Sequence, residues 1–118
     1  MKTAQLKNLF LTRGDTFFQA LRFESNGEPI DLSVNNEINV DIRQGITRQG
    51  KLIKKLSLGD GLEIVGEEND VLTIKMSTEI TETMRGGKYY LDVQITDEEN
   101  DKYTYCWGQI IVRENITD

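Results

Sequence analysis

Hydrophobic and polar residues alternate along most of this chain with a period of two, which is typical of β-strands. The clearest case is segment 37–43, where Ile38, Val40 and Ile42 share one phase and polar or charged residues share the other. This pattern predicts a half-buried strand of an antiparallel sheet. Similar patterns, separated by turn residues, predict further strands at 1–12, 16–23, 52–58, 62–65, 71–76, 88–96 and 103–112.

The period changes in segment 77–84. Ser77 or Thr78 can cap a short helical turn, and Ile80 and Met84 lie four residues apart, on one face of such a turn. Glycines then end it before the strand at 88–96. We therefore predict an all-β chain: one domain over residues 1–118, built as an antiparallel β-sandwich of seven to eight strands, with one helical turn before the penultimate strand.

The last strand does not keep one phase. Tyr103, Tyr105 and Trp107 alternate in one phase, whereas Ile110 and Val112 alternate in the other. A bulge or kink near Gly108 would let both sets face the core. Without it, the three rings form an outward row, and such a row is a candidate interface. Both alternatives stay open from the sequence.

Composition bears on function mainly by what it lacks. The 118 residues include no histidine and one cysteine, so a Ser-His-Asp or Cys-His site and an internal disulfide are both excluded within the chain. The net charge of −6 argues against nucleic acid as the main partner. No apolar run reaches the roughly 20 residues of a membrane span, and the N-terminus lacks the apolar core of a signal peptide. We predict no enzymatic activity, cofactor, metal or membrane.

Charge is unevenly distributed along the sequence. Residues 1–59 have a net charge of +3, and residues 60–118 have a net charge of −9. Between Asp41 and Asp60 lie five basic residues and no acid: Arg43, Arg48, Lys51, Lys54 and Lys55. Two interpretations stay open. The asymmetry can orient neighbouring copies of the chain, or the lysines can protect an exposed strand edge.

Four short features have weak functional interpretations beside ordinary structural ones. The acidic turn 97–101 offers oxygen ligands for Ca²⁺, but solvated hairpin tips have the same composition. Arg13-Gly14-Asp15 matches an integrin-binding tripeptide, yet its glycine also suits a turn. Asn115-Ile116-Thr117 is formally a glycosylation sequon. Cys106, between two aromatic residues, is expected to be a small core residue without a reactive thiolate.

Several motifs, in order, resemble the small immunoglobulin-like virion proteins of tailed phages and prophages, a group that includes the N-terminal module of baseplate upper proteins. Together they cover most of residues 13–117. The pieces that carry the resemblance are Arg13-Gly14-Asp15-Thr16-Phe17, Gly27-Glu28-Pro29-Ile30-Asp31-Leu32-Ser33, Gly87-Lys88-Tyr89-Tyr90-Leu91-Asp92-Val93, and Gly108-Gln109-Ile110-Ile111-Val112 with Ile116-Thr117.

The resemblance implies an immunoglobulin-like sandwich that docks onto a baseplate, tail or capsid through protein–protein contacts. The expected partners are other virion proteins or copies of the chain itself, and the expected location is the virion, after synthesis in the bacterial cytoplasm. Because the sequence stops at Asp118, we expect an accessory subunit and not a receptor-binding protein. The alternative is a carbohydrate- or host-surface-binding module, which would need the three aromatic rings as a flat exposed platform.

Tyr89 has a structural interpretation within such a fold. It opens the strand at 88–96, directly after the helical turn. Immunoglobulin-like domains place a tyrosine corner at this point, with its hydroxyl bonded to backbone upstream. We expect Tyr89 to support folding and not to bind a partner.

Overall fold

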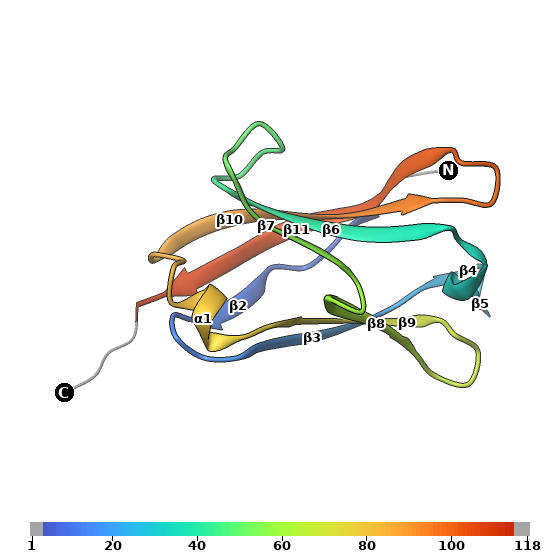
Figure 1. Cartoon of the computed structure of the whole chain (residues 1–118), viewed down its shortest axis with the longest axis horizontal. Coiled ribbons are helices and arrows are strands. Elements are labelled where there is room, and N and C mark those ends of the chain that lie inside the picture. The colour runs from blue at the N-terminus through green and yellow to red at the C-terminus, as the bar shows by residue number, and fades with distance from the viewer. Residues whose placement is uncertain (1–3, 115–118) are drawn as a thin grey trace.

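Two layers of strands face each other across one hydrophobic core in the computed structural model, which describes residues 4–114 (Figure 1). The larger layer contains β1 (Ala4–Gln5), β2 (Leu9–Thr12), β6 (Glu37–Gln44), β7 (Leu52–Leu58), β10 (Gly87–Thr96) and β11 (Lys102–Arg113). The smaller layer contains β3 (Phe17–Arg22), β8 (Gly61–Val65) and β9 (Val71–Met76). A two-strand hairpin, β4 (Glu24–Ser25) and β5 (Glu28–Pro29), lies apart from both.

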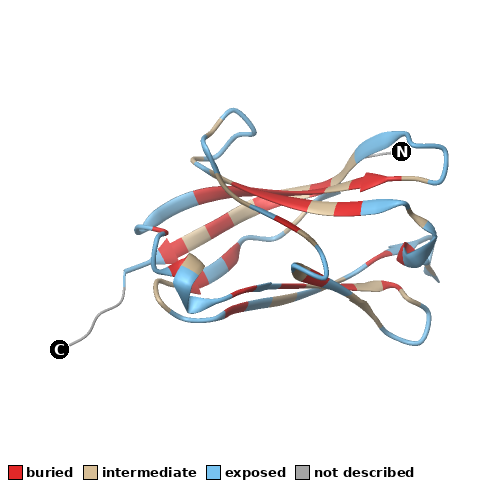
Figure 2. Cartoon of the chain, in the orientation of Figure 1, coloured by how far each residue is buried: buried red, intermediate tan, exposed pale blue. Residues whose placement is uncertain are grey.

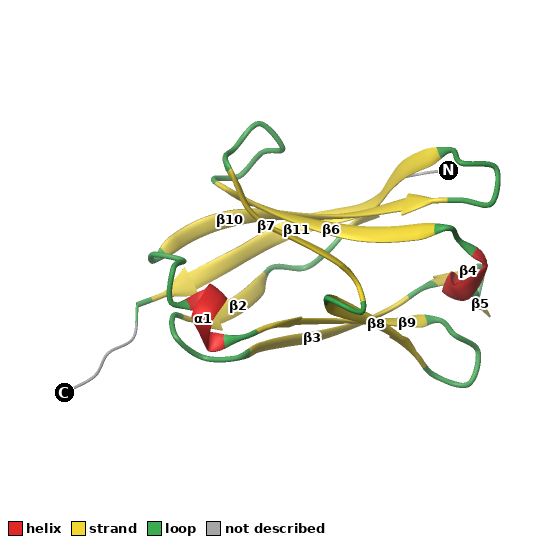
Figure 3. Ribbon diagram, viewed as in Figure 1, coloured by secondary structure: helices red, strands yellow, loops and turns green. Residues whose placement is uncertain are grey.

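The strands follow the order β1-β11-β10-β6-β7-β8-β9-β3, and β2 pairs in parallel with β11. β7 pairs with β6 and then, through Ser57 and Leu58, with β8, so it links the two layers. The fold is an immunoglobulin-like β-sandwich, as predicted. Eight strands in residues 4–114 have four or more residues, and the helix α1 (Thr78–Thr81) precedes β10, the penultimate strand (Figure 3).

The core is formed by the inward phase of each long strand. Buried and exposed residues alternate visibly along the strands in Figure 2. The prediction for segment 37–43 is confirmed, because Ile38, Val40 and Ile42 are all at most 1% exposed. The other inward residues that are fully buried in the same core include Leu72, Ile74, Met76, Leu91, Val93 and Ile110.

The helical turn is attached to the core at its C-terminal side. Met84 is fully buried and Ile80 is partly buried against the core. Ser77 is the N-cap residue, with extended backbone, although its side chain makes no capping hydrogen bond. The hydroxyl of Thr81 donates to the backbone oxygen of Asp15 at 2.8 Å and thereby fastens the turn to the β2–β3 connection.

The change of phase in β11 occurs at Tyr105 and not near Gly108. Val93 of β10 pairs with Cys106, and the next residue, Gln94, pairs with Thr104, so Tyr105 is the extra residue of a bulge. The predicted position of the kink is therefore wrong. An extra residue on one strand reverses the facing of the side chains beyond it, which brings Cys106, Ile110 and Val112 to the core side.

Gly108 has a different role, which is to admit the N-terminal segment. It keeps regular register opposite Leu91 and is buried. A Cβ atom at Gly108 would lie 2.9 Å from the Cβ of Leu6, and the Leu6 amide donates to the oxygen of Trp107 at 2.7 Å. A larger side chain at Gly108 would displace this contact.

None of the helices in residues 4–114 has the length and apolar character required to cross a membrane.

Candidate protein-binding surface

The outer face of the small sheet carries an exposed apolar surface around Phe18. In β3, Phe17 faces inward with 3% exposure, and Phe18 faces outward with 61% exposure. On the other side of this surface, Leu58 at the end of β7 is 42% exposed. We call this region the Phe18 surface. Large apolar side chains that stay open to solvent next to one another are typical of protein contact sites.

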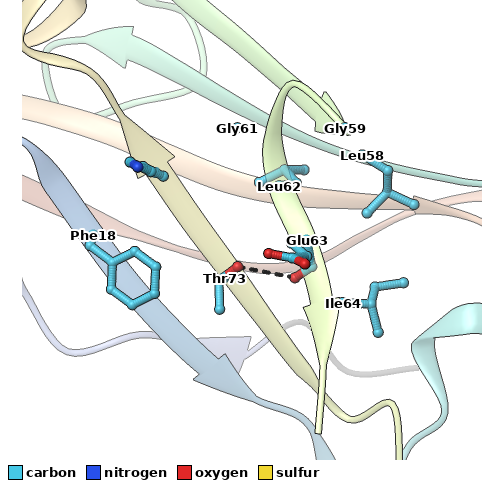
Figure 4. Close-up of a pocket in the computed structure, with 9 residues that line it drawn as sticks. Phe18, Leu58, Gly59, Gly61, Leu62, Glu63, Ile64 and Thr73 are labelled. Carbon is cyan, nitrogen blue, oxygen red and sulfur yellow. Dashed lines mark hydrogen bonds between the residues drawn. The ribbon is translucent and has the colours of Figure 1, made fainter.

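A shallow hollow lies between these two side chains (Figure 4). Its volume is about 560 Å³, and its wall comes from β3, β9, β8 and the turn that joins β7 to β8. The hydroxyl of Thr73 donates to the backbone oxygen of Glu63 at 3.3 Å in the wall of the hollow, so both of these polar groups already have a hydrogen-bond partner. Glu63 and Lys75 place one charge of each sign at the wall of an otherwise mainly apolar hollow.

The turn that bounds the hollow depends on Gly61. Its φ angle is +96°, a conformation that residues with a Cβ rarely adopt. A Cβ at this position would also lie 2.6 Å from Leu56 Cδ2 and 3.1 Å from the oxygen of Lys75. Gly61 therefore lets the turn pack closely against β7 and β9.

β3 forms one border of this surface and also ends the strand order. It pairs with β9 over its whole length, and no other strand within residues 4–114 pairs with its second edge. Such an edge offers backbone donors and acceptors to a further strand. Phe10 on β2, 68% exposed, lies near Phe18 along a second hollow of about 330 Å³. The exposed apolar area thus continues toward the open side of the sandwich.

The sequence interpretation did not single out Phe18. The signal was present, because Phe17, Leu21 and Phe23 share one phase of this strand and Phe18 lies in the other. A phenylalanine in the outward phase of an edge strand is the pattern to look for. The identity of β3 as an edge strand, however, follows only from the pairing of strands.

The three aromatic residues of β11 do not form one row. Tyr105 packs on the core side, with its ring edge-on to Phe23 at a centroid distance of 5.1 Å. Trp107 lies beyond the bulge on the opposite face, stacked on Tyr90 at 5.9 Å. Tyr103 is 37% exposed and its hydroxyl donates to Asp97 Oδ2 at 2.8 Å. A role for these residues in an interface stays a prediction, but the flat three-ring platform that a carbohydrate site would need is absent.

The outer face of the large sheet contains two buried aspartates side by side. Asp41 of β6 and Asp92 of β10 are register partners, exposed to 3% and 1%. The Gln94 amide donates to both carboxylates, at 3.3 Å to Asp41 Oδ2 and 3.4 Å to Asp92 Oδ1. Arg43 and Lys55 approach Asp41 to 3.4 and 3.3 Å. The outward phase was predicted to be polar, and this part of it is also buried.

The two aspartates differ in electrostatic environment. Burial raises the pKa of Asp92, and the neighbouring charge of Asp41 raises it further, against the opposing influence of Arg48 and Arg43. Asp41 has two cations in direct contact. Paired carboxylates with a raised pKa are the arrangement that acid–base chemistry uses. These two, however, line none of the hollows described above, and their low exposure gives a substrate no access.

The contacts and burial of Tyr89 and Cys106 indicate that both residues support the structure. The Tyr89 hydroxyl donates to the backbone oxygen of Arg85 at 2.9 Å, four residues upstream, which is the kind of contact a tyrosine corner makes. Cys106 is 3% exposed, and burial, with a smaller contribution from the charge of Asp92, raises the pKa of its thiol to about 12. A thiol with that pKa is not a nucleophile near neutral pH.

The Arg13-Gly14-Asp15 segment forms a turn that hydrogen bonds tie to neighbouring segments. Arg13 donates to the backbone oxygen of Glu82 at 2.8 Å and to the Glu114 carboxylate at 3.0 Å, while Gly14 takes a φ of +88°. The tripeptide is therefore the turn that joins β2 to β3, with Arg13 bonded to two other segments and Asp15 exposed. The sequon Asn115-Ile116-Thr117 lies outside the described residues.

The acidic turn 97–101 uses its first carboxylate internally. Asp97 Oδ1 accepts from the amides of Glu99 and Asp101, both at 2.9 Å. The bond from the Asp101 amide, followed by the bond from the Tyr103 hydroxyl, holds the pKa of Asp97 below its usual value. Within the part of the chain that the structure describes, no group of three or more histidine, cysteine, aspartate or glutamate side chains is arranged to hold a metal ion.

Comparison with known proteins bears on the fold and not on the surface. No protein-family model and no curated protein matches the chain. Among solved structures it is similar to the fibronectin(III)-like modules of CbhA from Clostridium thermocellum, with 10% identity over 97% of this chain and 92% of that chain and a TM-score of 0.46.

Two other solved structures are similar at the same level. CopC from Methylosinus trichosporium OB3b has 14% identity over 93% of this chain and 89% of that chain, with a TM-score of 0.49. A chain of the ZIG-8–RIG-5 IG1–IG1 heterodimer has 9% identity over 96% and 84%, with a TM-score of 0.39. These three proteins are not phage baseplate proteins, and the likenesses carry no argument about function.

Proposed function

We propose that this chain is a non-enzymatic protein-binding module that contacts a partner protein through the Phe18 surface. The observation that carries the proposal is the pair of exposed side chains, Phe18 and Leu58, on either side of an apolar hollow. Burying such side chains in a contact contributes about 25 cal/mol for each Å² of apolar area. The open edge of β3 beside them supplies backbone groups that fix the orientation of a partner.

We further propose that the partner belongs to a tailed-phage or prophage virion, in the baseplate, tail or capsid. This part rests on the sequence motifs that resemble immunoglobulin-like virion proteins. In the fold, the motif residues form turns and core positions: Gly14 shapes the β2–β3 connection, and Tyr89 braces the start of β10. The motifs thus describe a scaffold, and the Phe18 surface is the part of it that we assign to binding.

The test is incorporation into particles. A strain that carries the gene in a prophage is induced, and purified particles are probed for the chain. We expect the wild-type chain to copurify with particles. Phe18→Ser should lower its incorporation by about tenfold or more, as expected for a central contact residue. Glu79→Ser is the control, because Glu79 is exposed on α1 and lies outside the Phe18 surface.

Two results would count against the proposal. Absence of the wild-type chain from the particles, with normal expression in the cell, removes the virion assignment. Equal incorporation of the Phe18 and Glu79 variants removes the Phe18 surface as the contact. Circular dichroism of both purified variants verifies that each is folded.

A further inference from the structure

One end of the molecule gathers most of its acidic residues. Segments 24–37, 66–70 and 97–101 together contain eleven aspartates and glutamates and no basic residue. Four of these acids come from the first half of the sequence, which has a net positive charge overall. The fold thus collects into one region acids that the sequence distributes over three separate segments. We call this region the acidic end.

Hydrogen bonds show that the three segments are neighbours. The amide of Leu32 donates to the oxygen of Asn69 at 2.8 Å, which joins the first segment to the second. The side chain of Asn36 donates to Asn100 Oδ1 at 2.9 Å, which joins the first to the third. In Figure 1 the turns that contain them lie together at one end of the long axis.

Most of this charge is not neutralised within the fold. Arg22 pairs with Glu24 and Asp70, and the other nine acids have no ion pair with any residue from 4 to 114. Two apolar side chains are exposed among or beside these acids, Val34 at 51% and Tyr103 at 37%. The acidic end therefore combines a strong negative potential with a small apolar area.

A second region has the opposite charge. Segment 43–55, the end of β6, its loop and the first part of β7, contains five basic residues and no acid. Lys51 and Lys54 make no ion pair with the described residues. Ile46 and Leu52 are exposed here, at 54% and 41%. We call this region the basic hairpin. Its loop stands out from the face of the large sheet in Figure 1 and is largely exposed in Figure 2.

The two lysines of the basic hairpin that lack an ion pair, Lys51 and Lys54, do not neutralise the acidic end within one molecule, whereas Arg48 of the same hairpin reaches Thr104 of β11 at 3.4 Å. β6 runs from Glu37 at the acidic end to Gln44 at the basic hairpin, a span of eight residues and roughly 25 Å. The Debye length at physiological salt is about 8 Å, so the charges at the two ends of β6 are screened from each other. Each region is thus complementary to the other in charge and in apolar content, and a second molecule can bring Lys51 and Lys54 against the acids.

We propose that copies of this chain bind head to tail, with the basic hairpin of one copy against the acidic end of the next. Opposite charges orient the copies and speed their encounter, and the exposed apolar side chains on both regions provide burial. A contact between two different regions of the same chain generates a ring or a filament. This inference deepens the proposed function by naming one partner. It uses neither Phe18 nor Leu58, so the two proposals can fail separately.

The basic hairpin has a second physical role that the experiment must separate. On β7, only Ser57 and Leu58 pair with β8, so segment 52–56 has no strand within residues 4–114 on its outer edge. Lysines on an open edge discourage pairing with other strands. Replacing lysine with glutamate keeps a charge on that edge, so this protection is retained while the sign of the hairpin is reversed.

Sedimentation velocity at increasing protein concentration, at about 50 mM salt, tests the contact. We expect species larger than a monomer for the wild-type chain, which dissociate when salt is raised to about 500 mM. Lys51→Glu with Lys54→Glu, and separately Glu67→Lys with Glu68→Lys, should each weaken association by at least about tenfold. All four substitutions in one chain should restore it, because the charges are then exchanged and the net charge is again −6.

Control variants make each outcome decisive. Glu79→Lys with Glu82→Lys changes the net charge by the same amount outside both regions, and association should persist. Phe18→Ser should leave association unchanged as well. A wild-type chain that stays monomeric at about 1 mM overturns the proposal. So does association that resists both charge reversals, and so does a fourfold variant that fails to associate although it is folded by circular dichroism.

Discussion

On the outer faces of the two sheets, the burial of the residues is the opposite of what their polarity suggests. On the large sheet, the outward phase of β6 and β10 is polar, yet Asp41, Asp92 and Tyr90 are buried. On the small sheet, the outward Phe18 is apolar, yet it is mostly exposed. The two faces differ because long side chains, among them Trp107 stacked on Tyr90, lie over the outer face of the large sheet and shield it from water. Burial on an outer face therefore follows from what packs above it, and the uncovered apolar face is the one available to a partner.

Removing the cover of the large sheet should have the largest effect on stability. Trp107→Ala deletes the ring stacked on Tyr90 and opens the aspartate pair to water, which we expect to lower the free energy of unfolding by about 2 kcal/mol. Urea denaturation monitored by far-UV circular dichroism measures this change. Tryptophan fluorescence cannot be used, because Trp107 is the only tryptophan and the variant lacks it. Trp107→Phe keeps a stacked ring and should lose less. A change below about 0.5 kcal/mol would show that the ring is not a cover.

Neutralising one buried carboxylate should have a smaller effect of opposite sign. Because burial and the charge of Asp41 raise the folded-state pKa of Asp92 above 3.8, the folded state binds its proton more tightly than the unfolded state. The stability that this proton provides is present below pH 3.8 and is lost as pH rises through the raised value. Asp92→Asn should therefore stabilise the protein by about 1 kcal/mol at neutral pH, and the gain should vanish near pH 3.8.

The matched variant at the neighbouring position separates charge repulsion from a general effect of asparagine. Asp41→Asn leaves Arg43 and Lys55 without their carboxylate partner, so it should destabilise the protein at neutral pH. Thermal melts of both variants between about pH 3 and pH 8 provide the comparison. Two variants with the same sign at pH 7 would contradict the assignment of different environments to the two aspartates.

The smallest effect on stability is expected at the uncovered face. Phe18→Ser removes a ring that is mostly in water, so the free energy of unfolding should change by no more than about 0.5 kcal/mol. The same urea titration measures it. A loss above about 1 kcal/mol would mean that Phe18 supports the fold, and its loss from particles would then no longer report on binding alone.

Much of the fold could be predicted from local pattern. Inward phases such as Ile38-Val40-Ile42 and the helical turn before β10 depend on residues a few positions apart, and alternation reveals them directly. The bulge at Tyr105 could not be placed this way. The alternation places the change of phase of β11 between Trp107 and Ile110, whereas the pairing with Val93 and Gln94 places it at Tyr105.

The candidate surfaces depend even more on distant contacts. The sequence suggested a kink at Gly108 because the true reason for a glycine there is not local. Leu6, from the other end of the chain, packs where a side chain at position 108 would lie. Arg48 reaches Thr104 at 3.4 Å across the large sheet, a contact that neither segment predicts by itself. The acidic end was hidden for the same reason, since its segments meet only through bonds such as that from Leu32 to Asn69. The sequence pattern predicts which way a side chain points, and the tertiary fold determines which residues it contacts.

The parallel pairing of β2 with β11 has a mechanical consequence. Leu9, Phe10, Leu11 and Thr12 pair with Ile110, Ile111, Val112 and Arg113, and both strands run in the same direction. A pull that draws the start of β2 and the end of β11 apart loads these rungs together, in shear, and does not open them one at a time. Forced unfolding is governed by the barrier to that joint rupture. A pull along this pair is therefore resisted by all four paired positions at once.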